Sequence, residues 1–157
     1  VLIGPIKVME RLRADDLVVQ HPRSENLDGK VWLLGYDLSS STVKAGGRLR
    51  LTLYWQGLKT MDTDYTVFTH LLDTNGFLVA QRDNQPVGGN NPTSFWNEGE
   101  IVKDVYHIAI DPSTPAGLYL IEVGMYELSS GQRLLVLDGG GEVVDNRILL
   151  GEVKVVK

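Results

Sequence analysis

Polar and apolar residues alternate along much of this chain, and glycine-rich turns separate the alternating runs. The clearest run begins at Arg48 and continues as Arg-Leu-Arg-Leu-Thr-Leu to Leu53 before reaching Tyr54 and Trp55. Successive side chains of a β-strand point to opposite faces of its sheet, so this run has one buried and one exposed face. The pattern predicts a strand with Trp55 buried at its end.

Seven further segments carry a strand signal, and turn residues bound them. The eight predicted strands cover residues 31–38, 48–55, 64–73, 77–83, 101–110, 118–126, 133–137 and 147–156. Asn75-Gly76, between the third and fourth of these, is the sharpest hairpin signal. The segment 65–72 is apolar on both faces, which is typical of a central strand. Only residues 8–20 permit a helical reading, and that signal is weak, so we expect little helix.

About eight short strands with glycine-rich turns predict an all-β fold, a two-sheet antiparallel β-sandwich of jelly-roll-like form. We expect residues 29–157 to form the sandwich and residues 1–28 to form an N-terminal edge strand with its lead-in. Residues 1–8 share four of eight positions with residues 148–155. Two similar edge strands, chance, or a preceding tandem copy of the domain each explain this echo.

Composition excludes several classes of function. The chain of 157 residues has no cysteine, which removes disulfides, thiol catalysis and thiolate metal sites. Its net charge is −5, from 15 Lys and Arg against 20 Asp and Glu, and the basic residues are scattered along the sequence. Nucleic-acid binding requires a basic stripe, so we expect no nucleic acid as a partner. No apolar run is long enough to span a membrane.

The stretch from Asn84 to Gly99 is the first place to look for a binding site, because long loops in compact domains are more often functional than incidental. It contains Trp96 together with Asn90, Asn91 and Asn97. Sugars stack their C–H faces on aromatic rings while amides bind the hydroxyls, so these four residues are the candidate glycan-binding platform. The alternative is that Trp96 anchors the loop.

Histidines and carboxylates offer weaker signals for a metal or for catalysis. His70 and His107 with Asp104 are candidate metal ligands, but a hydrogen-bonded structural histidine is commoner and no HExxH spacing is present. Calcium is the ion that the many loop carboxylates would suit, although residues 73–76 match only half of an EF-hand loop and also fit a tight hairpin.

Carboxylates around the long loop leave two roles open. A hydrolase would use two of Asp83, Glu98, Glu100 and Asp104 across a cleft. In the structural alternative, which we prefer, Asp83 and Asp104 pin the two ends of the loop by accepting backbone amides. No nucleophile elbow or phosphate-binding loop is present, so we expect no enzymatic activity.

A series of short segments spread along the chain carries a family resemblance. The segments are 34–38 (Leu-Gly-Tyr-Asp-Leu), 51–55 (Leu-Thr-Leu-Tyr-Trp), 65–73 (Tyr-Thr-Val-Phe-Thr-His-Leu-Leu-Asp), 115–119 (Pro-Ala-Gly-Leu-Tyr) and 123–126 (Val-Gly-Met-Tyr). Together they resemble the extracytoplasmic β-sandwich segments attached to bacterial multi-spanning glycosyltransferases of the dolichyl-phosphate-mannose–protein mannosyltransferase type. The resemblance is a pattern of strands and turns, and it carries no site residue over to this chain.

The resemblance implies an outward-facing accessory domain of a membrane-embedded parent chain, with a general likeness to carbohydrate-binding modules. The leading hypothesis is therefore a non-catalytic extracytoplasmic module that binds or positions a glycan. A purely structural or protein-interaction spacer is the second hypothesis, and a small carboxylate-dependent hydrolase is the third. The sequence leaves the oligomeric state open.

Overall fold

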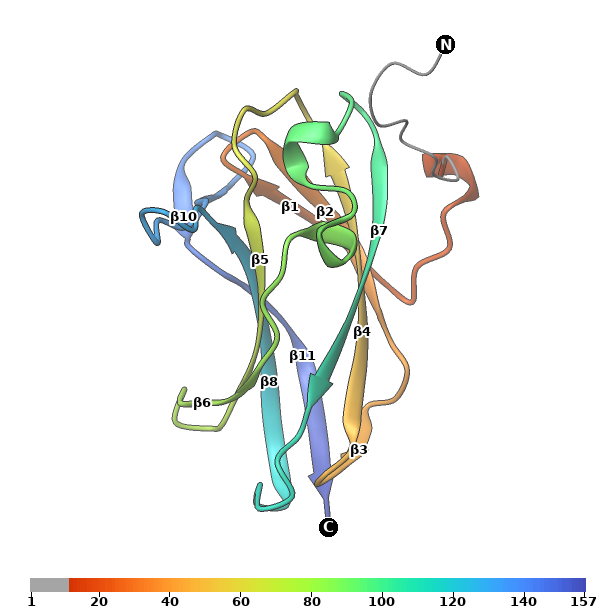
Figure 1. Cartoon of the computed structure of the whole chain (residues 1–157), viewed down its shortest axis with the longest axis vertical. Coiled ribbons are helices and arrows are strands. Elements are labelled where there is room, and N and C mark those ends of the chain that lie inside the picture. The colour runs from red at the N-terminus through yellow and green to blue at the C-terminus, as the bar shows by residue number, and fades with distance from the viewer. Residues whose placement is uncertain (1–11) are drawn as a thin grey trace.

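The computed structural model describes residues 12–157, which form two packed β-sheets (Figure 1). The strands are β1 (His21–Leu27), β2 (Val31–Leu38), β3 (Thr42–Lys44), β4 (Arg48–Gly57), β5 (Thr66–Leu72), β6 (Leu78–Gln81), β7 (Ile101–Ala109), β8 (Gly117–Tyr126), β9 (Val136–Leu137), β10 (Val143–Asp145) and β11 (Ile148–Val156). Three short 3-10 helices complete the elements: η1 (Ala14–Asp16), η2 (Pro86–Gly89) and η3 (Thr93–Phe95). The described residues contain no α-helix and no helix long and apolar enough to cross a membrane.

The strands form one six-stranded and one five-stranded sheet. Sheet A has the order β10-β9-β1-β2-β4-β7, and sheet B has the order β3-β11-β8-β5-β6. Neighbouring strands are antiparallel except β11 and β3, which are parallel. The predicted fold class, an all-β two-sheet sandwich, is confirmed. β5 lies inside sheet B between β8 and β6, as its two apolar faces predicted.

The buried faces of the two sheets form one hydrophobic core. In β4, Leu49, Leu51 and Leu53 are buried at 1% exposure or less, while Arg48 and Arg50 are exposed on the other face. Trp55 is fully buried at the end of this run, as predicted. Alternation in the sequence therefore reports burial directly, because side chains of one strand alternate between core and solvent.

The predicted hairpin between β5 and β6 is confirmed. The Gly76 amide donates to the Asp73 carbonyl, and the Asp73 carboxylate accepts the amides of Asn75 and Phe77. Gly76 has a φ of +84°, which a residue with a Cβ rarely adopts. Residues 73–76 thus act as a tight turn, the alternative that the sequence offered to an EF-hand loop.

Three strands were missed by the sequence analysis: β1, β3 and β10. β1 has the sequence His-Pro-Arg-Ser-Glu-Asn-Leu, in which only Leu27 is fully buried, and β10 is exposed along its length. β3 has only three residues. These strands lie near or at sheet edges and bury little, so they lack the apolar periodicity that predicts a strand.

The strand pairing of the sandwich begins before residue 29, at β1. β1 pairs with β2 through Leu27 and Val31 and with β9 through Leu27 and Val136. Upstream of β1, Gln20 donates its backbone amide to Asp37, and its side-chain oxygen accepts the amide of Leu38. In the predicted helical segment 8–20, the described part holds only η1. Residues 1–8, and with them the echo, lie outside the described residues.

Candidate functional site

The long loop places Trp96 inside the protein, so of the two roles that the sequence leaves open for it, the loop anchor fits the structure and the exposed stacking ring does not. Trp96 is 1% exposed, and its indole Nε1 donates to the backbone oxygen of Asn91 over 2.9 Å. Asn91 is itself fully buried, whereas Asn90 and Asn97 are exposed. Because the indole N–H is hydrogen-bonded within the loop, the ring can be buried in the core without an unpaired donor. Trp96 therefore anchors the loop, and a binding role for Asn90 and Asn97 stays a prediction.

Asp104 on β7 fixes the other side of this loop. Its Oδ1 accepts the backbone amide of Val87 over 2.7 Å, and its Oδ2 accepts Trp55 Nε1 at 3.2 Å and the Tyr106 hydroxyl at 2.6 Å. The predicted pinning by a carboxylate is confirmed for Asp104. Asp83 acts differently, since its Oδ2 accepts the hydroxyl of Tyr126 over 3.0 Å.

The burial of Asp104 is sufficient to explain why its pKa is raised. Burial raises the pKa of Asp104 to about 6, while the hydrogen bonds from Tyr106, Val87 and Trp55 act in the opposite direction. The side chain is fully buried and three donors from the protein occupy its oxygens. Perturbed carboxylates are candidates for functional sites, but this one does not face solvent and serves the loop.

Glu100, another carboxylate in the hydrolase hypothesis, is also held by the long loop. Its Oε1 accepts the backbone amide of Asn97 over 3.0 Å and the Asn97 side-chain amide over 3.3 Å. Its Oε2 accepts the side-chain amide of Asn91 over 3.3 Å. Glu100 and Asp104 therefore both organise the loop, and for Asp104 this is the structural role that we preferred from the sequence.

A groove of about 490 Å³ runs between the end of β6 and the edge of β7, and we call it the β6–β7 groove. Its lining is Arg48, Gln81, Arg82, Asn84, Gly88, Val105, Tyr106, His107 and Ala109. β7 is the last strand of sheet A and β6 the last strand of sheet B, and the loop that joins them, green in Figure 1, contributes Gly88 from η2. The groove therefore forms where the two sheets end side by side.

Strand register places the polar lining residues. Arg48 pairs with Ala109, and Arg50 pairs with His107, so Arg48 and His107 are diagonal neighbours on the exposed face of sheet A. On the opposite wall, Arg82 donates its backbone amide to the Thr69 carbonyl, and the Thr69 hydroxyl donates back to the Arg82 carbonyl. Backbone hydrogen bonds to β5 thus hold the wall in place and leave the side chains free to turn toward the groove.

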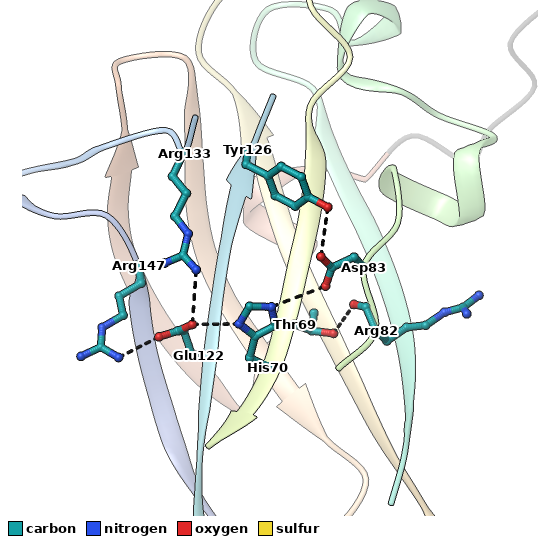
Figure 2. A network of polar contacts seen from close by, with 8 residues as sticks. All are labelled: Thr69, His70, Arg82, Asp83, Glu122, Tyr126, Arg133 and Arg147. Carbon is teal, nitrogen blue, oxygen red and sulfur yellow. Dashed lines mark hydrogen bonds and ion pairs between the residues drawn. The ribbon is translucent and has the colours of Figure 1, made fainter. Parts of the chain in front are cut away.

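The Arg82 side chain points away from a separate polar network that contains His70 and Glu122. Figure 2 shows the guanidinium of Arg82 extending away from His70 and Glu122, whereas the neighbouring Asp83 turns its carboxylate toward His70 and Tyr126. Adjacent residues thus serve different parts of the molecule. Arg82 lines the β6–β7 groove, and Asp83 joins the network on the outer face of sheet B.

This network, seen in Figure 2, centres on Glu122 of β8. Glu122 Oε2 accepts a hydrogen bond from Arg147 Nη1 over 2.7 Å, and Glu122 Oε1 makes a 2.9 Å hydrogen bond with His70 Nδ1. Arg133 Nη2 lies 3.8 Å from the same Oε1. Burial alone would raise the pKa of Glu122, but the hydrogen bonds from Arg147 and His70 outweigh it and hold the pKa below its usual range. The predicted structural role of His70 is confirmed.

The metal hypothesis gains no support from these positions. His70 lies on β5 of sheet B and His107 on β7 of sheet A, so they do not share a sheet. Residues 12–157 contain no group of three or more His, Asp or Glu side chains arranged to hold a metal ion.

Replacing Glu122 with glutamine is expected to flatten the acid side of the stability profile. A folded-state pKa below the unfolded value of 4.5 means that Glu122 contributes stability above pH 4.5, which is lost as pH falls through its folded pKa. At pH 7, Glu122→Gln should cost about 2 kcal/mol of unfolding free energy, because hydrogen bonds to a charged group are lost. Urea unfolding at a series of pH values between 3 and 7 measures both effects.

Glu142→Gln is the matched control, because Glu142 is exposed. This variant should keep the wild-type profile. Equal acid sensitivity in wild type and Glu122→Gln would show that the network contributes nothing to acid stability.

Comparison with solved structures supports the fold. The chain resembles the C-terminal domain of Wzt with a TM-score of 0.62 and 10% identity over 93% of this chain and 90% of that one. A Niemann-Pick type C2 protein from Japanese carpenter ant matches with a TM-score of 0.50 and 8% identity over 89% and 100% of the two chains. A CARDB domain from Pyrococcus furiosus matches with a TM-score of 0.47 and 13% identity over 92% and 100%.

At such low identities, the likenesses to the Wzt domain and to the Niemann-Pick type C2 protein show a shared β-sandwich fold and nothing finer. No protein-family model matches the chain, and no curated protein matches it in sequence. The resemblance to glycosyltransferase-attached domains is therefore supported at the level of the β-sandwich, and the attachment itself is a proposal.

The polar residues of the β6–β7 groove come from three separate stretches, so no local pattern in the sequence predicts the groove. Arg48 lies in β4, Gln81 ends β6 with Arg82 and Asn84 just after it, and His107 lies in β7. The exposed positions of the run at residues 48–53 were a usable signal for one wall of the groove, since they mark a strand face that is open to solvent. Which other segments meet that face depends on strand order, which local periodicity does not report.

Proposed function

We propose that this chain is a non-catalytic binding module that holds a segment of a glycan in the β6–β7 groove. The observation that carries the proposal is the groove itself, whose volume of about 490 Å³ is in the range of small-ligand sites. Its walls present amide, guanidinium and imidazole groups from Gln81, Asn84, Arg82, Arg48 and His107. Sugar hydroxyls both donate and accept hydrogen bonds, and such a mixed lining matches them.

The chemistry of the lining favours binding without cleavage. Glycoside hydrolysis uses two carboxyl groups that flank the scissile bond. The residues that line the β6–β7 groove include no Asp or Glu. The nearby Asp104 is fully buried, and its carboxylate accepts hydrogen bonds from Val87, Trp55 and Tyr106. A glycan in this groove would be retained rather than hydrolysed.

The setting we propose follows from the family resemblance. The module faces outward from a membrane-embedded glycosyltransferase-like parent and positions a glycan near it. The N-terminal part of the described chain is tied to sheet A by the hydrogen bond from the Gln20 amide to Asp37.

A purely structural spacer is the second candidate, and one observation favours it. Trp55 and Trp96 are both core residues, at 0% and 1% exposure. They supply stability rather than a stacking surface, as a spacer would require. The two functions differ in whether any glycan binds.

Titration calorimetry of the purified chain against neutral and acidic oligosaccharides tests the proposal. We expect at least one class to bind with a Kd of about 0.1–1 mM, which corresponds to about −4 to −5.5 kcal/mol. Gln81→Ala should weaken that binding about fivefold, because it removes one hydrogen-bonding group from the groove.

Gln132→Ala is the matched control, since Gln132 is exposed in the turn after β8 and does not line the groove. It should leave the affinity unchanged. Absence of binding by every oligosaccharide at millimolar concentration would favour the structural spacer instead.

A further inference from the structure

We infer that the β6–β7 groove selects glycans that carry negative charge. This inference rests on the proposed function and names the class of ligand. Arg48, Arg82 and His107 line the groove from both of its walls. Arg50, which pairs with His107 across β4 and β7, adds an exposed basic side chain to the same face of sheet A. Basic residues that are scattered in the sequence are thus gathered in space.

The two groove arginines differ from the paired arginines of the protein. Arg23 lies 3.8 Å from Glu25, and Glu122 receives both Arg133 and Arg147. The guanidinium groups of Arg48 and Arg82, in contrast, make no ion pair or hydrogen bond with any residue of the described range 12–157. The chain has an excess of carboxylates, 20 against 15 basic residues, so partners of opposite charge are not scarce.

The nearest carboxylate in sequence is directed elsewhere. Asp83 follows Arg82, but its carboxylate lies on the side of His70 and Tyr126, away from the Arg82 side chain in Figure 2. No residue that lines the groove is acidic. The arginines of the groove therefore have no acidic partner among its lining residues, while the carboxylates of Asp83 and Asp104 act on the hydroxyl of Tyr106.

The side chains of Arg48 and Arg82 have the geometry to recognise an anionic group. Its planar guanidinium offers a fork of N–H donors that matches a carboxylate or a phosphate group with two parallel hydrogen bonds. The shared ligand chemistry is an oxyanion carried on a sugar, either the carboxylate of a uronic acid or a phosphodiester between sugars. Gln81 and Asn84 remain for the hydroxyl groups of the same chain.

A polysaccharide fits this groove better than a nucleic acid does. Proteins that bind single strands stack the bases on exposed aromatic rings. The aromatic residue in the lining, Tyr106, is 3% exposed, and its hydroxyl is bound to Asp104. The groove therefore offers charge and hydrogen bonds but no stacking surface.

Titration calorimetry with four probes tests the inference on the full 157-residue chain. The probes are a neutral gluco-oligosaccharide, an oligogalacturonate, a phosphodiester-linked oligosaccharide and a single-stranded oligonucleotide of equal charge. At least one anionic oligosaccharide should bind about tenfold more tightly than the neutral one, and raising the salt concentration should weaken that binding. Which anionic oligosaccharide binds distinguishes carboxylate from phosphate recognition.

The double variant Arg48→Gln/Arg82→Gln should lose about tenfold or more in affinity for the anionic oligosaccharide, because both forks are removed. Arg13→Gln/Arg23→Gln is the matched control, since it lowers the net charge equally at residues outside the groove. It should retain wild-type affinity. Unchanged melting temperatures in both variants would show that the fold is intact.

The possible failures can be told apart. Equal affinity for neutral and anionic oligosaccharides, or equal losses in the two double variants, would overturn charge selection and leave glycan binding standing. Tighter binding of the oligonucleotide than of every oligosaccharide would overturn the inference in favour of a nucleic-acid ligand. No binding of any oligosaccharide would remove the proposed function and the inference with it.

Discussion

Replacing Asp104 with alanine is expected to lower the free energy of unfolding by about 3 kcal/mol. The change leaves three buried donors without an acceptor, namely Val87 N, Trp55 Nε1 and the Tyr106 hydroxyl. Each unpaired buried donor costs about 1–3 kcal/mol, and removing a carboxylate whose pKa is raised from 3.8 to about 6 returns about 3 kcal/mol at neutral pH. Thermal unfolding should show a melting temperature lower by about 6–12 °C.

Hydrogen exchange gives the same variant a second readout. The Val87 amide, which Asp104 accepts, should lose protection in Asp104→Ala before the amides of β8 do, because it belongs to the loop rather than to the sheet. Asp104→Asn keeps the shape and one oxygen, so its loss of stability should be smaller. Asp62→Ala removes an exposed carboxylate and should change little. A melting temperature for Asp104→Ala equal to that of the Asp62 variant would contradict the pinning role.

Replacing Phe68 with alanine is expected to cost about 3–5 kcal/mol, which is typical of a fully buried phenylalanine. Phe68 is 1% exposed although it lies on the face of sheet B turned away from the core. The Arg133 guanidinium covers its ring at 4.2 Å, and the His70 ring centroid lies 4.9 Å away. Below it, Gly124 leaves the space that the ring occupies, since a Cβ there would lie 2.4 Å from Phe68 Cζ.

Phe77→Ala provides the same chemical change at a residue that is 68% exposed. Denaturant unfolding should show a change below about 0.5 kcal/mol for this variant. A similar small change for Phe68→Ala would mean that the Arg133 and His70 cover contributes no stability. The pair of variants therefore measures what the outer face of sheet B adds beyond the core between the sheets.

Local sequence signals were sufficient for the strands that bury one or both faces. The alternation in β4 and the apolar segment of β5 predicted both elements and their burial, because strand periodicity and burial have the same cause. β1, β3 and β10 escaped detection because they bury few side chains. β1 belongs to sheet A through its backbone pairing with β2 and β9, and backbone pairing leaves little trace in side-chain pattern.

The candidate site could be predicted only in part. Asp104 was correctly expected to pin the long loop, whereas a binding role for that loop stays a prediction. The glycine and asparagine neighbours of Trp96 left both a surface platform and a loop anchor open, and the loop folds back and inserts the indole into the core. The glycine and asparagine content of a loop predicts that the chain can turn there. It does not predict which side chain of the loop points into the core.

By itself, the sequence determined the class of fold, the absence of thiol chemistry and the position of the hairpin at Asn75-Gly76, since each depends on residues close together in the chain or on composition. Only the tertiary structure decided where the basic side chains meet. Arg48, Arg82 and His107 come from different strands and a loop, and the ends of two sheets bring them into one groove. Strand order and sheet packing arise from contacts distant in sequence, so they create a site that no local pattern contains.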